Sequence, residues 1–367
     1  LKGTKITYTS GTTDKPKGVV LSEQAILNKV MALSESIEMS ENDVLLSILP
    51  LSTLLENIGG LYLPLYNGAT ATLFSPEQTG LSGSSGINPE KLLAAIQAVK
   101  PTAFIIIPQL LELLISAIEQ GYKLPDSVRY IAMGGAPISK DLLEKAKLLT
   151  IPVYEGYGFS EAASVVAVNR PSANQLGSVG KVLEPHQVRV SEDGEILVKN
   201  SLFNGYLGQK SHDSHQFYAT GDLGRLDDNG FLYVTGRKKN VINTSYGRNI
   251  SPEWIEKELD AIPLIRQSLI YGHGKPFLVA IIVPATSDFA KHIEILHKLI
   301  QQLNSKLPDY ARIKKMIIAD EAFSLQNGQL TGTGRPKRST IYQAYQLKLA
   351  HCYDHSGSEA SSTNIME

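Results

Sequence analysis

The chain has 367 residues, of which 43% are hydrophobic and 19% charged, and its 35 Lys and Arg residues nearly balance 36 Asp and Glu residues. This composition excludes a disordered chain and is typical of a globular protein with more than one domain. The near-neutral charge gives no reason to expect nucleic acid as a partner, the single Cys352 excludes an internal disulfide, and no apolar run could span a bilayer. We expect a cytoplasmic protein without a transmembrane segment, for which peripheral membrane contact stays open.

The first half of the chain alternates between strand and helix patterns. Strands are expected at residues 6–8, 43–49, 69–74, 102–107 and 128–133, and helices at residues 22–36, 59–66, 89–99 and 110–120. Residues 75–88 are rich in Ser and Gly and are expected to form a loop. This alternation predicts a layered α/β domain with parallel strands. Because the chain lacks an initiator Met and starts almost directly on a strand, we expect it to begin partway through a larger fold.

The pattern changes after residue 177. Short alternating strands are expected at residues 187–190, 195–199 and 231–234, separated by turn sequences that contain Asp-Gly or Asn-Gly. Such strands predict a small antiparallel sheet or a distorted barrel.

A third pattern occupies the remainder of the chain. Residues 251–253 read Ser-Pro-Glu, the residue types of a helix start. A hairpin is expected around residues 272–274, and apolar residues repeat with helical spacing over residues 289–303, as on a core-facing helix. Residues 356–367 are small and polar and are expected to be a disordered tail.

A loop dense in hydroxyl groups and glycine follows the first strand. Its side chains and backbone N–H groups suit phosphate oxygens at Thr9, Ser10, Gly11, Thr12 and Thr13. Lys15 and Lys17 add positive charge. The spacing is not that of a Walker loop, which needs Gly-x-x-x-x-Gly-Lys-Ser/Thr. We therefore expect a phosphate-binding loop of another kind.

Residues 10–18 resemble the Ser-Gly-Thr-Thr-Gly-x-Pro-Lys-Gly signature of the adenylate-forming superfamily, which includes acyl-CoA synthetases, luciferases and the adenylation domains of peptide synthetases. Asp14 stands where that family usually has Gly. An acid at this place adds repulsion beside a triphosphate and loses the freedom of glycine at positive φ. The resemblance implies an ATP site with altered phosphate handling.

Further segments follow in the order of the family's motifs. They are Leu49–Glu56, Gly134–Pro137, Tyr154–Glu161, Tyr218–Leu223, Gly236–Ile242, Ser245–Glu253 and Leu330–Arg338. The first is similar to the Leu-Pro-Leu-x-His-x-x-Glu segment near the acyl pocket, with Thr53 in place of His. The series covers nearly all of the chain and lacks the family's N-terminal portion.

The resemblance implies roles for single residues. The implied nucleotide-binding or CoA-binding residues are Thr9, Ser10, Gly11, Thr12, Thr13, Lys17, Gly135, Ala136, Pro137, Glu155, Tyr157, Gly158, Ser160, Asp222, Arg237, Lys239, Tyr246 and Gly247. The implied catalytic residues are Lys17, Glu161, Arg237 and Arg335, with Glu161 as the Mg²⁺ ligand. Tyr157 can stack on adenine, Ser160 can donate to the α-phosphate, and Asp222 can accept from the ribose hydroxyls.

The resemblance implies further roles for residues of the last motifs. Lys239 matches the position that the family uses as a hinge, and Tyr246 and Gly247 match a loop that lines the pantetheine channel. Arg335 stands where the family has a lysine that stabilises charge during attack on the α-phosphate. The planar guanidinium keeps the charge but not the shape, so adenylation is expected to be slower unless Lys337 takes over.

The implied organisation has four parts. Residues 1–176 would form the α/β part of an AMP-binding domain and residues 177–236 a small β-barrel-like subdomain. Residues 237–350 would form a smaller, mobile α+β lid domain, and residues 351–367 a disordered tail. The fold class implied is thus α/β, with an α+β C-terminal domain.

The implied function is an acyl-CoA ligase that uses ATP, Mg²⁺ and coenzyme A. A carboxylic acid, for which the motifs favour a fatty acid, would form an acyl-adenylate and pyrophosphate, and the CoA thiol would then release AMP. Two alternatives stay open. The first is an acyl-AMP ligase that passes its acyl group to a carrier protein. The second is a non-catalytic nucleotide-binding relative that acts as a scaffold or regulator, which Asp14, Thr53 and Arg335 favour.

Overall fold

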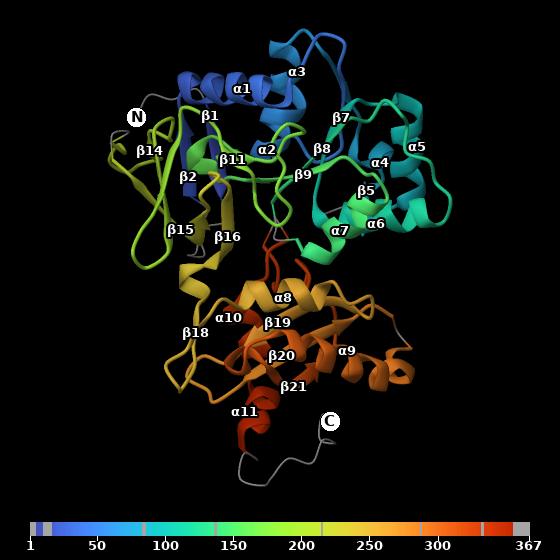
Figure 1. Cartoon of the computed structure of the whole chain (residues 1–367), viewed down its shortest axis with the longest axis vertical. Helices are drawn as coiled ribbons and strands as arrows, with labels where there is room; N and C mark the ends of the chain where they lie inside the picture. The colour runs from blue at the N-terminus through green and yellow to red at the C-terminus, as the bar shows by residue number, and fades with distance from the viewer. Residues whose placement is uncertain are drawn as a thin grey trace. The chain divides into compact units, whose positions relative to one another are not determined.

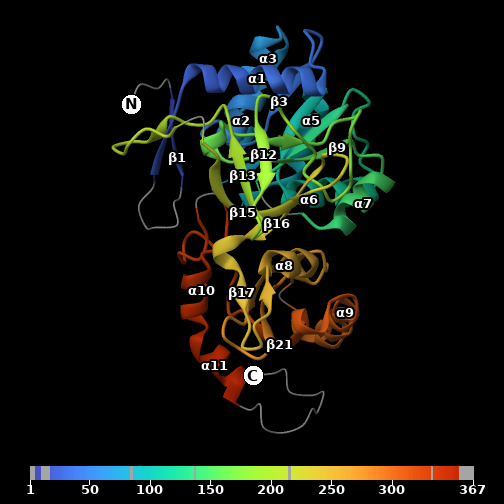
Figure 2. The same cartoon turned by 60° about the vertical axis from the view of Figure 1, so that its left-hand side comes forward.

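The chain divides into two compact units, Leu1–Val234 and Thr235–Glu367. The computed structural model describes residues 5–9, 17–82, 86–135, 138–213, 216–286, 288–331 and 334–354. Figures 1 and 2 show the elements of each unit in two views. Across the described ranges, no helix is both long and apolar enough to cross a membrane. The prediction of a disordered tail from residue 351 is wrong for residues 351–354, which end the helix Gln346–Asp354, and residues 355–367 lie outside the described ranges.

A seven-stranded sheet forms the centre of the first unit. In spatial order its strands are β11 (Lys181–Val182), β10 (Ala167–Val168), β9 (Val153–Tyr157), β8 (Tyr130–Met133), β7 (Ala103–Ile106), β3 (Val44–Ser47) and β4 (Thr70–Leu73). The neighbours from β9 to β4 pair in parallel, and β10 pairs antiparallel with β9 and β11. The predicted parallel α/β layer is therefore confirmed.

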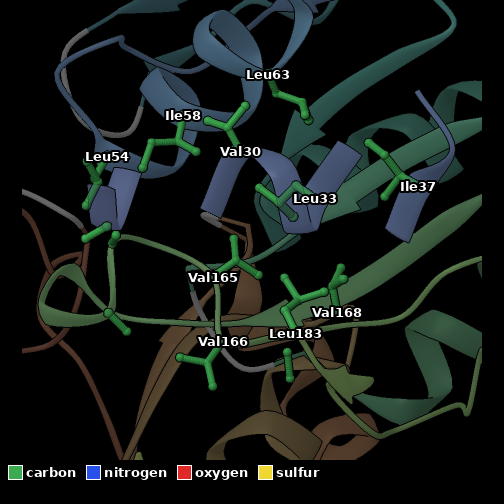
Figure 3. Close-up of a cluster of buried hydrophobic side chains, with 14 of the residues drawn as sticks. Val30, Leu33, Ile37, Leu54, Ile58, Leu63, Val165, Val166, Val168 and Leu183 are labelled. Atoms are coloured by element: carbon green, nitrogen blue, oxygen red, sulfur yellow. The ribbon is translucent and has the colours of Figure 1, made fainter. Parts of the chain in front are cut away.

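Helices cover both faces of this sheet. They are α1 (Glu23–Ile37), α2 (Leu54–Glu56), α3 (Leu63–Tyr66), α5 (Pro89–Val99), α6 (Pro108–Glu119) and α7 (Lys140–Leu148). Side chains alternate along a strand, so Ala103 of β7 packs in one apolar cluster with α1 to α3, and Phe104 packs in the other with α5 to α7. Figure 3 shows the first cluster, in which Val30 of α1 lies beside Ile58 and the cluster continues through Leu33 to Val165 and Leu183.

The prediction of a loop over residues 75–88 is wrong for part of that range. Helix α4 (Pro76–Thr79) and the short strands β5 (Leu81–Ser82) and β6 (Gly86–Ile87) occupy it. The reason lies in local capping, because Ser75 and Gln78 form a reciprocal capping box at the start of α4. The Ser-rich composition hid this signal.

The helix predicted at residues 59–66 is present but begins as a π-helix over Asn57–Tyr62, between α2 and α3. Two glycines allow this geometry. A Cβ at Gly59 would lie 2.7 Å from Ile105 Cδ1, and a Cβ at Gly60 would collide with Glu56 Oε1. Short π-helical segments within helices often occur at functional sites.

Besides the antiparallel pair of β5 and β6, the first unit has two larger antiparallel sheets. One has the order β1 (Lys5–Thr9), β2 (Lys17–Leu21) and β14 (Gly205–Tyr206); the other has the order β12 (Gln187–Val190), β13 (Glu195–Lys199), β15 (Tyr218–Leu226) and β16 (Leu232–Arg237). The boundary between the two units falls within β16. Strand β15 was not expected, because its Thr-Gly-Asp sequence reads as a turn.

The second unit has one three-stranded sheet between two pairs of helices (Figure 2). Its main elements are α8 (Pro252–Asp260), β19 (Ile265–Tyr271), β20 (Leu278–Pro284), α9 (Ile293–Lys306), β21 (Ile313–Ile318), α10 (Arg338–Ala344) and α11 (Gln346–Asp354). Alternate side chains of β20 pack with α8 and α9 on one face and with α10 and α11 on the other. The hairpin predicted around residues 272–274 and the core face over residues 289–303 are confirmed.

Candidate active site

Strands β1 and β2 hold the two ends of the predicted phosphate loop together. They pair antiparallel from Lys5 opposite Leu21 to Thr9 opposite Lys17. Thr9 and Lys17 therefore face each other across the base of the loop. The loop residues themselves, which include Ser10, Gly11, Thr12, Thr13 and Asp14, lie outside the described residues.

Tyr206 joins Lys17 to the predicted metal ligand. The Lys17 ammonium lies 5.3 Å from the centre of the Tyr206 ring. The Tyr206 hydroxyl donates to Glu161 Oε1 at 2.6 Å and lies 3.1 Å from the Tyr218 hydroxyl. Residues from β2, β14, β15 and the segment after β9 thus meet at one point.

Tyr157 and Asp222 form the second half of this cluster. The Tyr157 hydroxyl, at the carboxyl end of β9, donates to Asp222 Oδ2 at 2.7 Å. Asp222 is buried in β15, where its backbone N–H donates to Thr220 Oγ1 and that hydroxyl donates to Ile196 O. The strand therefore fixes the carboxylate, and the tyrosine orients it.

Glycines shape the backbone around the strand ends. Gly135 follows β8 with a φ of +88°, a conformation that favours glycine. A Cβ at Gly158 would collide with the carbonyl oxygen of Ser164, so this position accepts no side chain. Ala136 and Pro137 lie outside the described residues, while Glu155 and Ser160 lie half-buried in β9 and just after it.

The Leu-Pro-Leu segment reaches the same edge of the sheet. A Cβ at Gly134 would lie 3.3 Å from Leu55 Cδ2, so α2 packs directly against the turn after β8. Thr53, which replaces the family's histidine, donates its hydroxyl to Pro50 O at 2.8 Å and closes a turn. The carboxyl edge of a parallel sheet is where α/β proteins usually bind ligands.

Glu56 is buried behind this edge. Burial raises the pKa of Glu56 to about 7, although the Ser47 hydroxyl and the N–H groups of Leu49 and Ile48 act in the opposite direction. Neither carboxyl oxygen makes a hydrogen bond of good geometry with the described residues. The protonated carboxyl is therefore the form that the folded state favours.

We expect Glu56→Gln to remove a pH dependence of stability. The folded state binds the Glu56 proton more tightly than the unfolded state, so wild-type stability falls as pH rises from about 4.5 through 7. The stability of the neutral Gln variant should fall less over that range. The difference in the free energy of unfolding between variant and wild type should therefore grow by about 3 kcal/mol. Urea unfolding at several pH values measures it, with exposed Glu41→Gln as control. Parallel pH profiles for wild type and Glu56→Gln would contradict the assignment.

Three of the predicted basic site residues, Arg237, Lys239 and Arg335, lie near one another in the second unit. Burial, followed by the charges of Arg237 and Arg335, lowers the pKa of Lys239, while Glu253 acts in the opposite direction. Arg335 is exposed on a turn in which Thr331 N donates to Arg335 O at 2.8 Å and Gly334 has a φ of +76°. Arg237, Lys239 and Arg335 therefore share one electrostatic environment.

Tyr246 and Gly247 occupy a turn of their own between β17 (Ile242–Asn243) and β18 (Asn249–Ile250). Tyr246 is 76% exposed, and Gly247 has a φ of +72°. Gly247 N donates to Thr244 O at 2.9 Å. The turn presents the tyrosine to solvent, as a binding loop would.

Sequence reasoning missed the side chains that connect these motifs. Tyr206 and Tyr218 received no role, and the buried ion pair of Arg338 and Glu256 in the second unit was not expected. Tyr206 lies in a two-residue strand, which leaves no periodic signal. Its pairing with β2 comes from the topology and could not be inferred from local sequence.

Family models and curated relatives match most of this chain. The model of the AMP-binding enzyme family matches residues 5–207, and that of the AMP-binding enzyme C-terminal domain matches residues 239–357. The long-chain-fatty-acid–CoA ligase FadD15 of Mycobacterium bovis is 25% identical, with 95% of this chain and 68% of FadD15 covered. A 2-succinylbenzoate–CoA ligase of Listeria monocytogenes is 30% identical, with 89% of this chain and 68% of that ligase covered.

A solved structure shows the same relationship. The o-succinylbenzoate CoA synthetase of Bacillus subtilis, in complex with its acyl-adenylate intermediate, superposes with a TM-score of 0.75 at 25% identity, covering 92% of this chain and 68% of that one. The same synthetase has been solved with ATP and a magnesium ion. The chain spans about two thirds of the length of these relatives. It belongs to the AMP-binding enzymes, and within them to the adenylate-forming acid–CoA ligases.

Proposed function

We propose that this protein is an AMP-forming acid–CoA ligase and that its acid is a fatty acid. One observation supports the proposal most. The Tyr206 hydroxyl donates to Glu161 and the Tyr206 ring contacts the Lys17 ammonium, while the Tyr157 hydroxyl donates to Asp222. Ring contacts of Tyr157 with Phe159 and of Phe159 with Tyr218, whose hydroxyl lies beside that of Tyr206, join the two groups. The residues proposed for phosphate, metal, adenine and ribose therefore belong to one cluster. Folding alone could bring these segments together. The residue types in the cluster, however, match the chemical groups of a nucleotide.

The residues present fit Mg²⁺ bound together with ATP phosphates. The described residues contain no group of three or more His, Cys, Asp or Glu side chains that could hold a metal alone. Mg²⁺ usually keeps several waters and binds through one or two carboxylates and substrate phosphates. Glu161 suits that arrangement, and a bound Mg²⁺ would neutralise phosphate charge.

In the proposed first step, a carboxylate oxygen attacks the α-phosphorus, and the bond to pyrophosphate breaks. Asp222 and Tyr157 orient the nucleoside, and the Ser160 hydroxyl donates to the α-phosphate. Lys17, Arg237 and Arg335 supply positive charge for the phosphate oxygens. Positioning and charge thus carry the step, as is general for phosphoryl chemistry.

In the proposed second step, the CoA thiol attacks the carbonyl carbon, loses its proton, and AMP leaves. We assign Tyr246 and Gly247 to the loop that receives the pantetheine arm, because this turn is exposed and glycine-containing. We assign Lys239, which follows closely after the boundary between Leu1–Val234 and Thr235–Glu367, to the hinge between these two units.

A panel of acids tests the substrate. The relatives include ligases named for long-chain fatty acids and for 2-succinylbenzoate, so both classes belong in the panel. Pyrophosphate, AMP and thioester are measured with ATP and Mg²⁺, with and without CoA. Thioester from fatty acids supports the proposal. Thioester from an aromatic acid alone would contradict the fatty-acid substrate and indicate an aromatic one.

The alternatives have their own outcomes in the same assay. Pyrophosphate and acyl-adenylate without thioester would indicate a ligase that transfers to a carrier protein. Nucleotide binding without turnover would indicate a non-catalytic relative.

Reverting two departures from the family sequence should accelerate the first step. Arg335→Lys replaces a bulky planar group by a point charge, and Asp14→Gly removes an acid beside the phosphates. We expect each to raise the rate of acid-dependent pyrophosphate release by roughly three- to tenfold. Lys314→Arg, which changes an exposed lysine in β21, is the control. Unchanged rates in both variants would show that neither residue limits adenylation.

A further inference from the structure

Tyr206 contacts both a residue at the base of the phosphate loop and the proposed metal ligand. Its ring lies 5.3 Å from Lys17 Nζ, and its hydroxyl donates to Glu161 Oε1 at 2.6 Å. It is half-buried in β14, a strand held by pairing of Gly205 with Val20 and of Tyr206 with Val19 in β2. The same strand, β2, begins at Lys17.

The direction of the hydrogen bonds follows from counting hydrogens. A phenol has one hydrogen to donate. Tyr206 gives its hydrogen to the carboxylate, so the Tyr218 hydroxyl, 3.1 Å away, donates to Tyr206. The Tyr218–Tyr206–Glu161 chain therefore has one fixed polarity.

Glu161 has a second restraint from the same segment of chain. Its carbonyl oxygen accepts from Phe203 N at 2.7 Å, and the Phe203 ring contacts Tyr206 edge to face, with ring centres 4.9 Å apart. Phe203 also contacts Tyr218, with centres 5.5 Å apart. Backbone and side chain of Glu161 are both held by residues 203–206, which limits how its carboxylate can turn.

We propose, on the basis of the proposed function, that Tyr206 is a positioning residue for Mg·ATP. Its hydroxyl occupies Oε1 of Glu161 and so directs Oε2 to the metal. Its ring holds the Lys17 ammonium, so the base of the phosphate loop and the metal ligand keep a fixed separation. Partners that orient a metal ligand commonly change metal affinity or activity by about 10- to 100-fold when they are removed.

Tyr206→Phe tests the hydroxyl and keeps the ring. We expect Mn²⁺ binding in the presence of a non-hydrolysable ATP analogue, followed by electron paramagnetic resonance, to weaken about 10- to 100-fold. Affinity for the analogue without metal should stay unchanged, because Lys17 keeps its contact with the ring. The Mg²⁺ concentration that gives half-maximal pyrophosphate release should rise by the same factor.

The chain offers a matched control in Tyr233→Phe. Tyr233 also donates its hydroxyl to a carboxylate, that of Asp227 at 3.2 Å, and its ring also contacts a cation, Arg225. That pair lies near the turn between β15 and β16 and has no role in the proposal. Metal binding by Tyr233→Phe should equal that of wild type.

Tyr218→Phe is a second variant, which tests the chain of hydrogen bonds from Tyr218 through Tyr206 to Glu161. It should weaken Mn²⁺ binding in the same direction as Tyr206→Phe but less. In the double variant the Tyr218 change should add nothing, because the hydroxyl that Tyr218 serves is already absent. Additive effects of the two changes would overturn the proposed chain.

The binding measurement separates this proposal from the proposed function, since it needs no turnover. If wild type binds Mn²⁺ with the analogue but consumes no acid, the proposed function is contradicted. The Mn²⁺ affinities of wild type and Tyr206→Phe can still be compared. Tyr206→Phe that binds Mn²⁺ like Tyr233→Phe would overturn the positioning role. Equal weakening of analogue binding with and without metal would also overturn it, as a general packing effect.

Discussion

Replacing Arg338 by Met is expected to destabilise the second unit by about 3–5 kcal/mol. The Arg338 guanidinium, 15% exposed, makes a bidentate ion pair with Glu256, one arm of which is 2.7 Å long. Glu256 also accepts from Ile270 N at 2.7 Å. Without Arg338, a carboxylate would remain buried and unpaired, which explains the large expected loss. Hydrogen exchange of amides in α8 and α10 measures it.

Two further variants separate the ion pair from general packing. Arg266→Met changes an exposed arginine in β19 and should alter stability by less than about 0.5 kcal/mol. The double variant Arg338→Met with Glu256→Leu removes both charges and should recover most of the loss, because apolar residues often replace a buried pair without cost. A double variant as unstable as Arg338→Met alone would refute this explanation.

The second large effect is expected at Glu161. Glu161→Gln keeps the shape of the side chain but removes the charge that would hold Mg²⁺, so we expect acid-dependent pyrophosphate release to fall roughly 10²- to 10³-fold. Excess Mg²⁺ should recover part of the rate. The assay varies Mg²⁺ at saturating ATP and acid.

Exposed Glu192→Gln provides the control for Glu161→Gln and should behave as wild type. A Glu161→Gln variant within about threefold of wild type at every Mg²⁺ concentration would remove Glu161 from the proposed metal site. It would also remove the reason for assigning Tyr206 a role in metal binding.

The sequence predicted the elements whose signals are local. The helix over Pro89–Val99 was predicted with its observed limits from the helical spacing of its apolar residues. The structure shows that Asn88 caps this helix and that Pro89 begins it. The buried strand over Ala103–Ile106 appeared as a continuous apolar run, as expected for a strand covered on both faces. Alternation of such segments was enough to predict the parallel layer.

The contacts that build the candidate site are not local. Tyr206 and Glu161 lie 45 residues apart, and Arg338 and Glu256 lie 82 residues apart. Each pair depends on which strands and helices become neighbours, and local periodicity carries no such information. Strand β14 has two residues and strand β15 contains a turn-like Thr-Gly-Asp, so the elements that bring these side chains together gave weak or misleading signals.

The fate of the substrate oxygens tests the central claim most directly. The acid is supplied with ¹⁸O in both carboxyl oxygens, together with ATP, Mg²⁺ and CoA, and the products are analysed by mass spectrometry. If the carboxylate attacks the α-phosphorus, AMP gains one ¹⁸O atom, the thioester keeps the other, and pyrophosphate has none. Label in phosphate or pyrophosphate, or AMP formed without label, would contradict an acyl-adenylate route.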